Sequence, residues 1–379
     1  MSETKFTFPV EYHEFHKDKA FNFQLNRWYS MGYARFEDME KAGQKINSFE
    51  EWKIEMLNLA QVAVSEGRLI NAAYNYRAAE LFTTREDPDK EHLYNKFIDY
   101  FYKAFQDDEI KNFEVPYNDT FLPAIRIQPA NTEKKGTIVL HGGFDSFIEE
   151  LYSSMKSFSD NGYEVIAFDG PGQGAARKKY GLAFDYEWEK PAKAILDYFK
   201  LEDVTLLGIS MGGWLCLRAA AFEPRIKRVI AQSVSFDVIQ YTNPIGQLLA
   251  KLFFRKFRKF TNNAMVKKMK KKQMYSWFVN NLMYITNKEV PIEGFDVLLQ
   301  LNEENLHSDF VKQDVLVLTG RKDHMIPFKM HDMQVKALTD AKSVIDRIFT
   351  KEENAQNHCQ IGNIGLALDV MVKWIDGKS

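Results

Sequence analysis

The chain has 379 residues, of which 45% are hydrophobic and 27% charged, and its formal net charge is −2. A chain of this length can bury a large core, as one sizeable domain with an extra module. The near balance of charge gives no reason to expect a polyanion such as nucleic acid as the main partner.

The two cysteines, Cys216 and Cys359, lack the spacing of a disulfide framework or a zinc site. A reducing compartment is therefore expected, with neither a metal nor a cofactor. The first residues lack an apolar signal core, and no run of about 18 apolar residues occurs along the chain. These features predict a cytoplasmic protein that does not span a membrane.

Apolar residues between about Asn47 and Asp108 recur at steps of three and four, beginning with Trp52 and Met56. This period is that of an amphipathic helix, so an all-helical region is expected over residues 1–110. The region holds no cluster of nucleophile, base and acid. It is interpreted as a scaffold or dimerisation module, with a share in a substrate pocket as the alternative.

From residue 111 onward the pattern changes to short β-branched runs separated by segments of helix length. Apolar strands that alternate with helices are typical of a mostly parallel sheet covered by helices on both faces. Residues 111–379 are therefore predicted to form an α/β domain, with active groups on loops at the carboxyl ends of strands. The expected strands are 136–140, 163–168, 204–207, 228–231 and 315–318, with a last strand-like run over 343–350.

A glycine-rich segment, His141-Gly142-Gly143-Phe144, directly follows the first of these strands. Consecutive glycines let backbone amides approach a developing oxyanion. The amide of Phe144 or Gly143, paired with that of Met211, is therefore expected to form an oxyanion hole. A turn that needs glycine only for its geometry is the alternative.

Two further segments allow more than one interpretation. Glu149 and Glu150, shortly after the glycines, either form salt bridges within the fold or hold a cationic group of the substrate. The segment Asp169-Gly170-Pro171-Gly172-Gln173-Gly174 lacks the Gly-Lys-Ser/Thr ending of a phosphate-binding loop. We expect it to shape the rim of the site.

Ser210 lies in Gly208-Ile209-Ser210-Met211-Gly212, between a strand-like run and a helix-like run. This context is typical of a nucleophile elbow, where a serine on a tight strand-to-helix turn stands clear of the backbone. Flanking side chains would collide where strand and helix meet, which explains both glycines. Ser210 is therefore the predicted nucleophile.

About 80 residues separate the strands that end near Val234 and begin near Asp314, far more than a typical connection. We interpret the segment at about 237–310 as a helical lid. Its apolar residues, Trp277 and Phe278 among them, are expected to wall an apolar pocket over the nucleophile. They are Leu248, Leu249, Leu252, Phe253, Phe254, Phe257, Phe260, Trp277, Phe278, Met283 and Tyr284.

The stretch 251–272 carries ten Lys or Arg and no Asp or Glu, with phenylalanines interleaved. Such a stretch is typical of a helix that lies on an anionic membrane. The same pattern arises in a lid whose apolar residues face inward and whose lysines face water. The second interpretation is favoured, and membrane contact is not the expectation.

Two residues beyond the lid complete a catalytic constellation. Asp323 stands in a polar turn after a strand. Its position gives the chain order Ser, Asp, His that is expected of a catalytic triad on this kind of fold. Capping of the following helix is the alternative role. His358 stands in a polar loop just before the terminal helix, where it can reach the elbow. Asp237 is the fallback acid, and His324 and His331 are less favoured because they adjoin the loop and helix of the acid itself.

Several motifs occur together along nearly the whole chain: Gly67 to Ala73, Tyr76 to Ala79, His141 to Gly143, Asp169 to Gly174, Gly208 to Gly213, Gly320 with Asp323, and Asn357 to Cys359. Together they resemble an α/β-hydrolase of the branch that includes the fermentation-respiration switch protein family, dihydroxypseudooxynicotine hydrolase and fungal polyketide-shortening pigment hydrolases. The resemblance implies triad roles for Ser210, Asp323 and His358. It also implies that the helical region packs near the lid, and that the protein is a homodimer.

These features predict a serine hydrolase that cleaves a small, largely apolar ester, amide or thioester through an acyl-enzyme. A carbon–carbon hydrolase of the β-diketone or acyl-aromatic ketone type is the first alternative. By the resemblance, that chemistry calls for an extra acid near the lid, yet no Asp or Glu occurs between Val238 and Lys288. A hydrolase-like regulatory binding protein is the second alternative, disfavoured because such a protein has no need for a complete triad.

Overall fold

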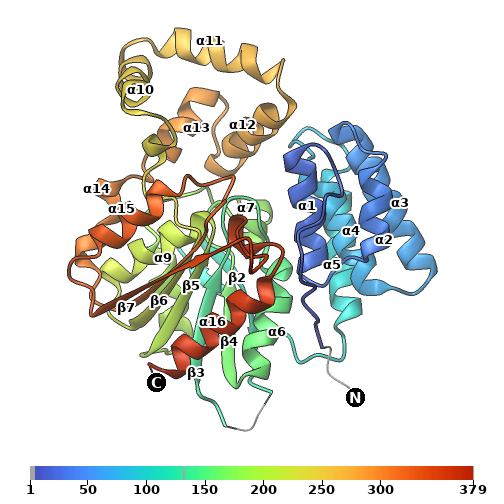
Figure 1. Ribbon diagram of the computed structural model, residues 1–379, viewed down its shortest axis with the longest axis horizontal. Helices are drawn as coiled ribbons and strands as arrows, with labels where there is room; N and C mark the ends of the chain where they lie inside the picture. The colour runs from blue at the N-terminus through green and yellow to red at the C-terminus, as the bar shows by residue number, and fades with distance from the viewer. Residues whose placement is uncertain (1–4, 131–132, 379) are drawn as a thin grey trace.

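The computed structural model describes residues 5–130 and 133–378. Figure 1 shows three parts: a helical region near the N-terminus, a central sheet with helices on both faces, and a group of helices above the sheet. The central part has the α/β arrangement that the alternation of strands and helices predicts.

The helical region holds α1 (Lys19–Ser30), α2 (Phe36–Gly43), α3 (Phe49–Ser65), α4 (Leu69–Leu81) and α5 (Lys90–Ala104). Helix α4 lies between α3 and α5, and all its residues from Ala72 to Leu81 are buried. Its alanines allow this close packing because they carry little volume. The helical periodicity did not identify α1 and α2, since buried polar residues such as Asn22 and Gln24 interrupt the apolar pattern of α1.

Among the described residues, eight strands form one sheet in the order β1-β2-β4-β3-β5-β6-β7-β8. From β4 to β8 the neighbours are parallel, whereas β2 pairs antiparallel with both β1 and β4. All the expected strands are present, and the hairpin β1–β2 is an addition that sequence reasoning missed. The strands are β1 (Lys111–Tyr117), β2 (Thr120–Ile127), β3 (Gly136–His141), β4 (Tyr163–Phe168), β5 (Val204–Ile209), β6 (Ile226–Gln232), β7 (Asp314–Gly320) and β8 (Ser343–Phe349).

The two faces of the sheet belong to two separate cores. Ile138 and Leu140 of β3 point into one core, and Val139 between them points into the other, as the alternation of a strand requires. The first core includes α6 (Tyr152–Asp160), α16 (Ile364–Asp376) and the helical region. The second includes α8 (Glu189–Phe199), α9 (Met211–Phe222) and α15 (Lys329–Ala337). The helical region therefore shares one of the two hydrophobic cores with the α/β domain.

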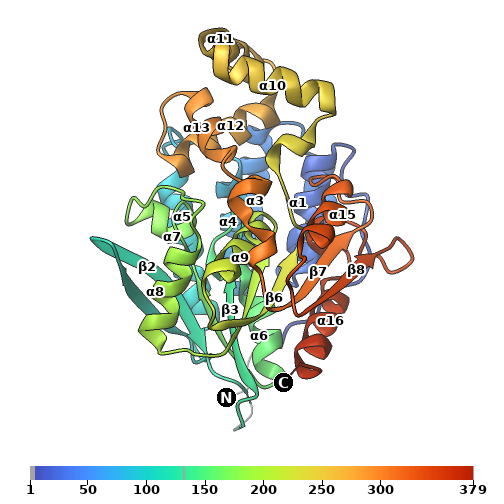
Figure 2. The same cartoon turned by 90° about the vertical axis from the view of Figure 1, so that its left-hand side faces the viewer.

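The segment between β6 and β7 contains α10 (Pro244–Lys256), α11 (Arg258–Met269), α12 (Gln273–Thr286), α13 (Pro291–Leu298) and the short α14 (Glu303–Leu306). Figures 1 and 2 show α10 and α11 as the outermost layer, with α12 and α13 between them and the sheet. We call helices α10 to α13 the insertion.

The two layers of the insertion differ in burial. Helix α12 buries Val279, Leu282 and Met283, but α10 has no buried residue and α11 buries only Met265. The expectation that the apolar residues of this segment face inward is therefore wrong for the outer layer. An amphipathic pattern identifies an apolar face without fixing the direction in which it points.

Candidate active site

Ser210 occupies the turn between β5 and α9, at the carboxyl end of a central strand. Its φ of 61° and ψ of −122° are values that a residue with a side chain rarely adopts. A Cβ on Gly208 would collide with the carbonyl oxygen of Gly212, so this crossing of strand and helix requires glycine. The amide of Ser210 donates to the carbonyl of Gln232 on β6, which fixes the turn against the sheet.

His358 stands between the other two predicted catalytic residues. Its Nε2 lies 2.9 Å from Ser210 Oγ, and its Nδ1 lies 2.8 Å from Asp323 Oδ2. The other oxygen of Asp323, Oδ1, accepts hydrogen bonds from the amides of Met325 and Ile326. Asp323 therefore caps the following turn and faces His358 at the same time, so the two interpretations of this residue are compatible.

The electrostatics of the pair follow from burial and mutual attraction. Burial disfavours the imidazolium, but the facing carboxylate of Asp323 outweighs burial and raises the pKa of His358 well above its ordinary value. Burial likewise disfavours the charged carboxylate, but His358 and the two amides lower the pKa of Asp323. Each group therefore stabilises the charged form of the other.

The loop that carries His358 is fixed to the sheet by its backbone. Gln232 Nε2 donates to the carbonyl of Cys359, and the amide of Cys359 donates to Ser233 Oγ. At the end of β7, a Cβ on Gly320 would collide with the carbonyl of Asn357. The bare backbone at Gly320 allows the histidine loop to approach the strand that delivers Asp323.

The fallback residues have other partners. Asp237 accepts a hydrogen bond from the amide of Ile239 and caps the 3-10 helix Val238–Tyr241. His331 Nδ1 lies 3.0 Å from Thr319 Oγ1, and the ring of His324 packs on Phe23 of α1. None of the three takes the place of Asp323 or His358 beside the elbow.

The glycine-rich loop after β3 lies directly against the elbow. A Cβ on Gly143 would come within 2.9 Å of the carbonyl of Ile209 and within 3.1 Å of the amide nitrogen of Met211. The Gly143 amide itself donates to Ser146 Oγ at 3.0 Å. Of the two donors proposed for this loop, Phe144 is therefore the better candidate, and Gly143 supplies the close approach.

Gln173, in the glycine-rich segment after β4, fixes the same loop from one side. Its Nε2 donates to the carbonyls of Gly142 at 2.8 Å and Gly143 at 3.1 Å, and its Oε1 accepts from the amide of Gly170. These bonds orient the peptide groups that precede the amide of Phe144. The segment, which was expected to shape the rim of the site, holds the glycine-rich loop after β3 in place.

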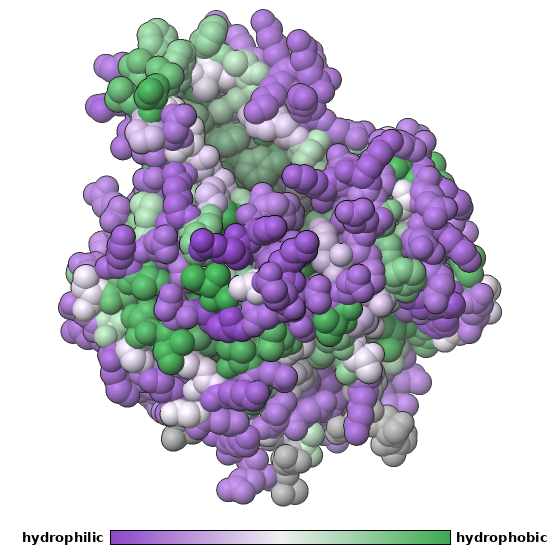
Figure 3. Space-filling view, viewed as in Figure 1, coloured by the Kyte–Doolittle hydropathy of each residue, from purple (hydrophilic) through white to green (hydrophobic). Residues whose placement is uncertain are grey.

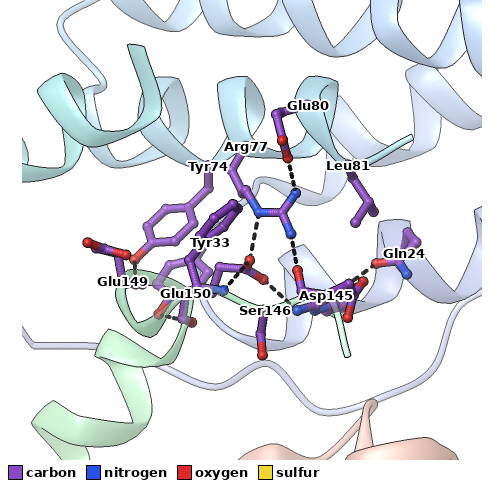
Figure 4. Close-up of polar contacts among 12 residues, drawn as sticks. Gln24, Tyr33, Tyr74, Arg77, Glu80, Leu81, Asp145, Ser146, Glu149 and Glu150 are labelled. Carbon is purple, nitrogen blue, oxygen red and sulfur yellow. Dashed lines mark hydrogen bonds and ion pairs between the residues drawn. The ribbon is translucent and has the colours of Figure 1, made fainter. Parts of the chain in front are cut away.

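Arg77 of α4 also holds this loop, as Figure 4 shows. Its guanidinium donates to the carbonyl of Asp145, to Glu150 Oε1 at 2.6 Å and to Glu80 Oε2 at 2.7 Å. The side chain is 2% exposed. Sequence reasoning missed Arg77, although a charged residue among the alanines of a buried helix was an available signal.

Two stacked tyrosines extend this contact to the 3-10 helix Ile148–Leu151. Tyr33 and Tyr74 have ring centroids 3.4 Å apart, and their hydroxyls donate to the carbonyls of Glu150 and Glu149 (Figure 4). The Glu150 carboxylate also pairs with Arg27 of α1. Two helices of the helical region therefore hold the segment that follows the glycine-rich loop.

The outcomes for the two glutamates differ. Glu150 is fully buried between two arginines, which supports the salt-bridge interpretation over contact with a substrate. Glu149 is also buried, burial raises its pKa to about 7, and its Oε2 has no hydrogen-bond partner in the described part of the chain. Neither carboxylate is placed as a partner for a cationic substrate.

Phe144 is the point where three parts of the molecule meet. Phe278 of α12 stacks on the Phe144 ring with centroids 5.1 Å apart. Trp277 of α12 packs edge-on against Phe82 and donates its Nε1 hydrogen to the carbonyl of Leu81 at 2.7 Å. The inner layer of the insertion therefore joins the helical region beside the glycine-rich loop after β3.

Comparison with known proteins places the chain in a class that fits this fold and site. Residues 138–346 match the alpha/beta hydrolase fold family, and the chain belongs to that family. Within the described residues, no helix is long and apolar enough to cross a membrane.

The individual relatives are similar to different extents. The chain is 35% identical over 193 residues to 20-hydroxy-prefusarin hydrolase of Gibberella moniliformis, a match that covers 46% of each chain. It is 25% identical to the alpha/beta hydrolase psoB of Aspergillus fumigatus, over 97% of this chain and 94% of that one. The crystal structure of 2,6-dihydroxy-pseudo-oxynicotine hydrolase superposes with a TM-score of 0.67 at 19% identity, covering 92% and 94% of the two chains.

Proposed function

We propose that the protein is a serine hydrolase that cleaves a small, largely apolar ester, amide or thioester through an acyl-enzyme on Ser210. The observation that carries the proposal is the position of His358, with Nε2 2.9 Å from Ser210 Oγ and Nδ1 2.8 Å from Asp323 Oδ2. A serine hydroxyl needs such a base, and the base needs such a carboxylate.

In the first step His358 Nε2 takes the proton of Ser210 Oγ while that oxygen attacks the carbonyl carbon of the substrate. The electrons of the carbonyl move onto its oxygen, which accepts hydrogen bonds from the amides of Phe144 and Met211. Asp323 stabilises the imidazolium. Collapse of the intermediate expels the leaving group, which takes the proton from His358, and water then releases the acyl group by the same route.

The substrate class follows from the groups around the elbow. Phe144 and Phe278 stack at one side of the site, and the Phe23 ring of α1 lies 6.0 Å from the ring of His358. Aromatic walls favour an apolar acyl or leaving group. In this proposal the segment at about residues 237–310, which contains the insertion, is the lid. The helical region, residues 1–110, supplies part of the pocket wall.

The test is covalent labelling by a fluorophosphonate, read by intact-protein mass spectrometry. Wild type is expected to gain one adduct, and Ser210→Ala none. The matched control is Ser65→Ala, which removes an exposed hydroxyl at the end of α3 and should label like wild type. Absence of an adduct on wild type, or an adduct on Ser210→Ala, would contradict the proposal.

A substrate panel then separates the possible reactions. The leading proposal expects turnover of a short-chain p-nitrophenyl ester or an acyl thioester, abolished by Ser210→Ala. Turnover of an acylated phenolic ketone in preference to esters would instead indicate a carbon–carbon hydrolase that uses the same triad.

A further inference from the structure

The outer layer of the insertion exposes a group of large apolar side chains. Figure 3 shows apolar atoms gathered at the upper left, over the position that α10 has in Figure 1. We call this group the outer apolar patch. Its members are Ile245 (73% exposed), Leu248 (69%), Leu249 (46%), Leu252 (44%), Phe257 (51%) and Phe260 (66%).

The spacing of the patch shows that it is one face of a helix. Positions 245, 248, 249 and 252 are related by steps of three and four, so their side chains line one side of α10. The opposite side makes the internal contacts, as where Phe254 packs on Phe295 of α13. Soluble proteins rarely leave such a contiguous apolar face in water.

The patch lies within the most basic part of the chain. Residues 251–272 carry ten Lys or Arg and no acidic residue, although the whole chain has a net charge of −2. Among the described residues, only Arg258 of this stretch forms an ion pair, with Asp296. The remaining charges of α10 and α11, such as Lys251 and Arg255, are exposed and lack an acidic partner there.

We propose that α10 and α11 dock on an anionic lipid surface. In this arrangement the outer apolar patch enters the headgroup region, and the surrounding lysines and arginines lie against lipid phosphates and carboxylates. The contact is peripheral, with α10 in the plane of the interface.

Charge favours a lipid surface over the two other kinds of occupant. In a two-fold contact with a second copy the same patch faces itself, which would bring two strongly basic stretches together. A nucleic acid would satisfy the charges, but it offers no apolar region for Ile245 or Phe260. An anionic bilayer satisfies the charged and the apolar groups together.

The test is co-sedimentation of the full chain with vesicles of phosphatidylcholine alone or with about 30% phosphatidylserine. At about 50 mM NaCl, binding to the anionic vesicles is expected to exceed binding to the neutral ones by at least about tenfold, and about 500 mM NaCl should abolish most of it. No pelleting with anionic vesicles at low salt would overturn the proposal. So would equal binding to both kinds of vesicle.

Two variants locate the contact. The double substitution Leu248→Ser and Phe260→Ser should lower binding about tenfold or more, because it removes apolar insertion and leaves every charge in place. The matched control, Phe121→Ser with Ile345→Ser, removes two exposed apolar side chains on β2 and β8 and should bind like wild type. Equal loss in both variants would overturn the assignment to α10 and α11.

Light scattering on the same proteins tests the competing occupant. A wild-type dimer that becomes a monomer in the Leu248→Ser, Phe260→Ser variant, without vesicle binding by wild type, would assign the patch to a second copy. The salt dependence of wild-type binding remains informative if the variant does not fold. None of these measurements depends on the proposed enzymatic activity.

Discussion

The molecule carries two sets of helices outside its α/β core, and they relate to the core in opposite ways. In the helical region, α4 buries every residue from Ala72 to Leu81, and Arg77 reaches the loop beside the proposed active site. In the outer layer of the insertion, α10 buries none of its residues. The first set is a structural component of the site, whereas the second presents its apolar residues outward. Helical sequence alone does not distinguish the two, and the placement of charge does: α4 buries its charges in pairs, and α10 leaves them unpaired in water.

The largest expected difference between the two sets of helices is in the free energy of unfolding that is lost when an arginine is replaced. Arg77→Met should lower the free energy of unfolding by about 3–5 kcal/mol, because it leaves the carboxylates of Glu150 and Glu80 buried without this partner. The matched change Arg258→Met breaks the exposed pair with Asp296 and should cost less than about 1 kcal/mol. Urea denaturation followed by circular dichroism measures both. Equal losses of unfolding free energy would mean that the helical region is no more tightly packed into the fold than the outer layer.

A smaller effect, on catalysis rather than folding, is expected at Gln173. Its amide fixes the carbonyls of Gly142 and Gly143, so Gln173→Ala should misplace the oxyanion loop and lower kcat about 10- to 100-fold with little change in KM. The control is Gln247→Ala on α10, whose amide donates hydrogen bonds to Gln240 and Thr242 and which should leave kcat unchanged. A rise in KM at constant kcat would instead assign Gln173 to substrate binding.

The pH response should depend on the buried site and not on the outer layer. In the proposed mechanism the neutral form of His358 is the base. Asp323 raises the pKa of His358, so kcat/KM should rise with pH through a midpoint above the ordinary histidine value of about 6.5. Asp323→Asn should move the midpoint to lower pH along with a loss of rate. His324 and Cys359 also face the imidazole, and their substitution should shift the midpoint less. A wild-type midpoint at or below 6.5 would contradict this prediction.

The same pair links pH to stability. The pKa of His358 is raised in the folded state, so its contribution is fully present below the unfolded pKa of about 6.5 and is lost as pH rises through the folded pKa. The depressed pKa of Asp323 acts at the other end, because its contribution is lost as pH falls through that pKa. Urea titrations of wild type and Asp323→Asn, made at pH values from below the pKa of Asp323 to above that of His358, measure both contributions to the free energy of unfolding.

The sequence indicated those parts of the proposed site whose placement depends on local geometry. The elbow at Ser210 is specified by a strand, two glycines and a helix within a few residues, and the strand order places Asp323 and His358 on loops at the same edge. Arg77 was not predicted because its partners Asp145 and Glu150 lie 68 and 73 residues away in the chain. The expected helical region included the position of α1, but periodicity did not delimit that helix, because its buried side chains include amides that bond to the backbone, as Asn26 does to His13.

The direction in which the insertion faces was beyond the reach of pattern reasoning, and one pair of substitutions tests it in the absence of any ligand. Leu282 of α12 is 1% exposed, and Leu282→Ala should lower the free energy of unfolding by about 2–5 kcal/mol. Leu248 of α10 is 69% exposed, and Leu248→Ala should change it by no more than about 0.5 kcal/mol. The two changes delete the same atoms, so the difference reports burial alone. A large loss of unfolding free energy in Leu248→Ala that grows with protein concentration would mean that a second copy covers α10 in solution. Only an oligomer makes apparent stability depend on protein concentration.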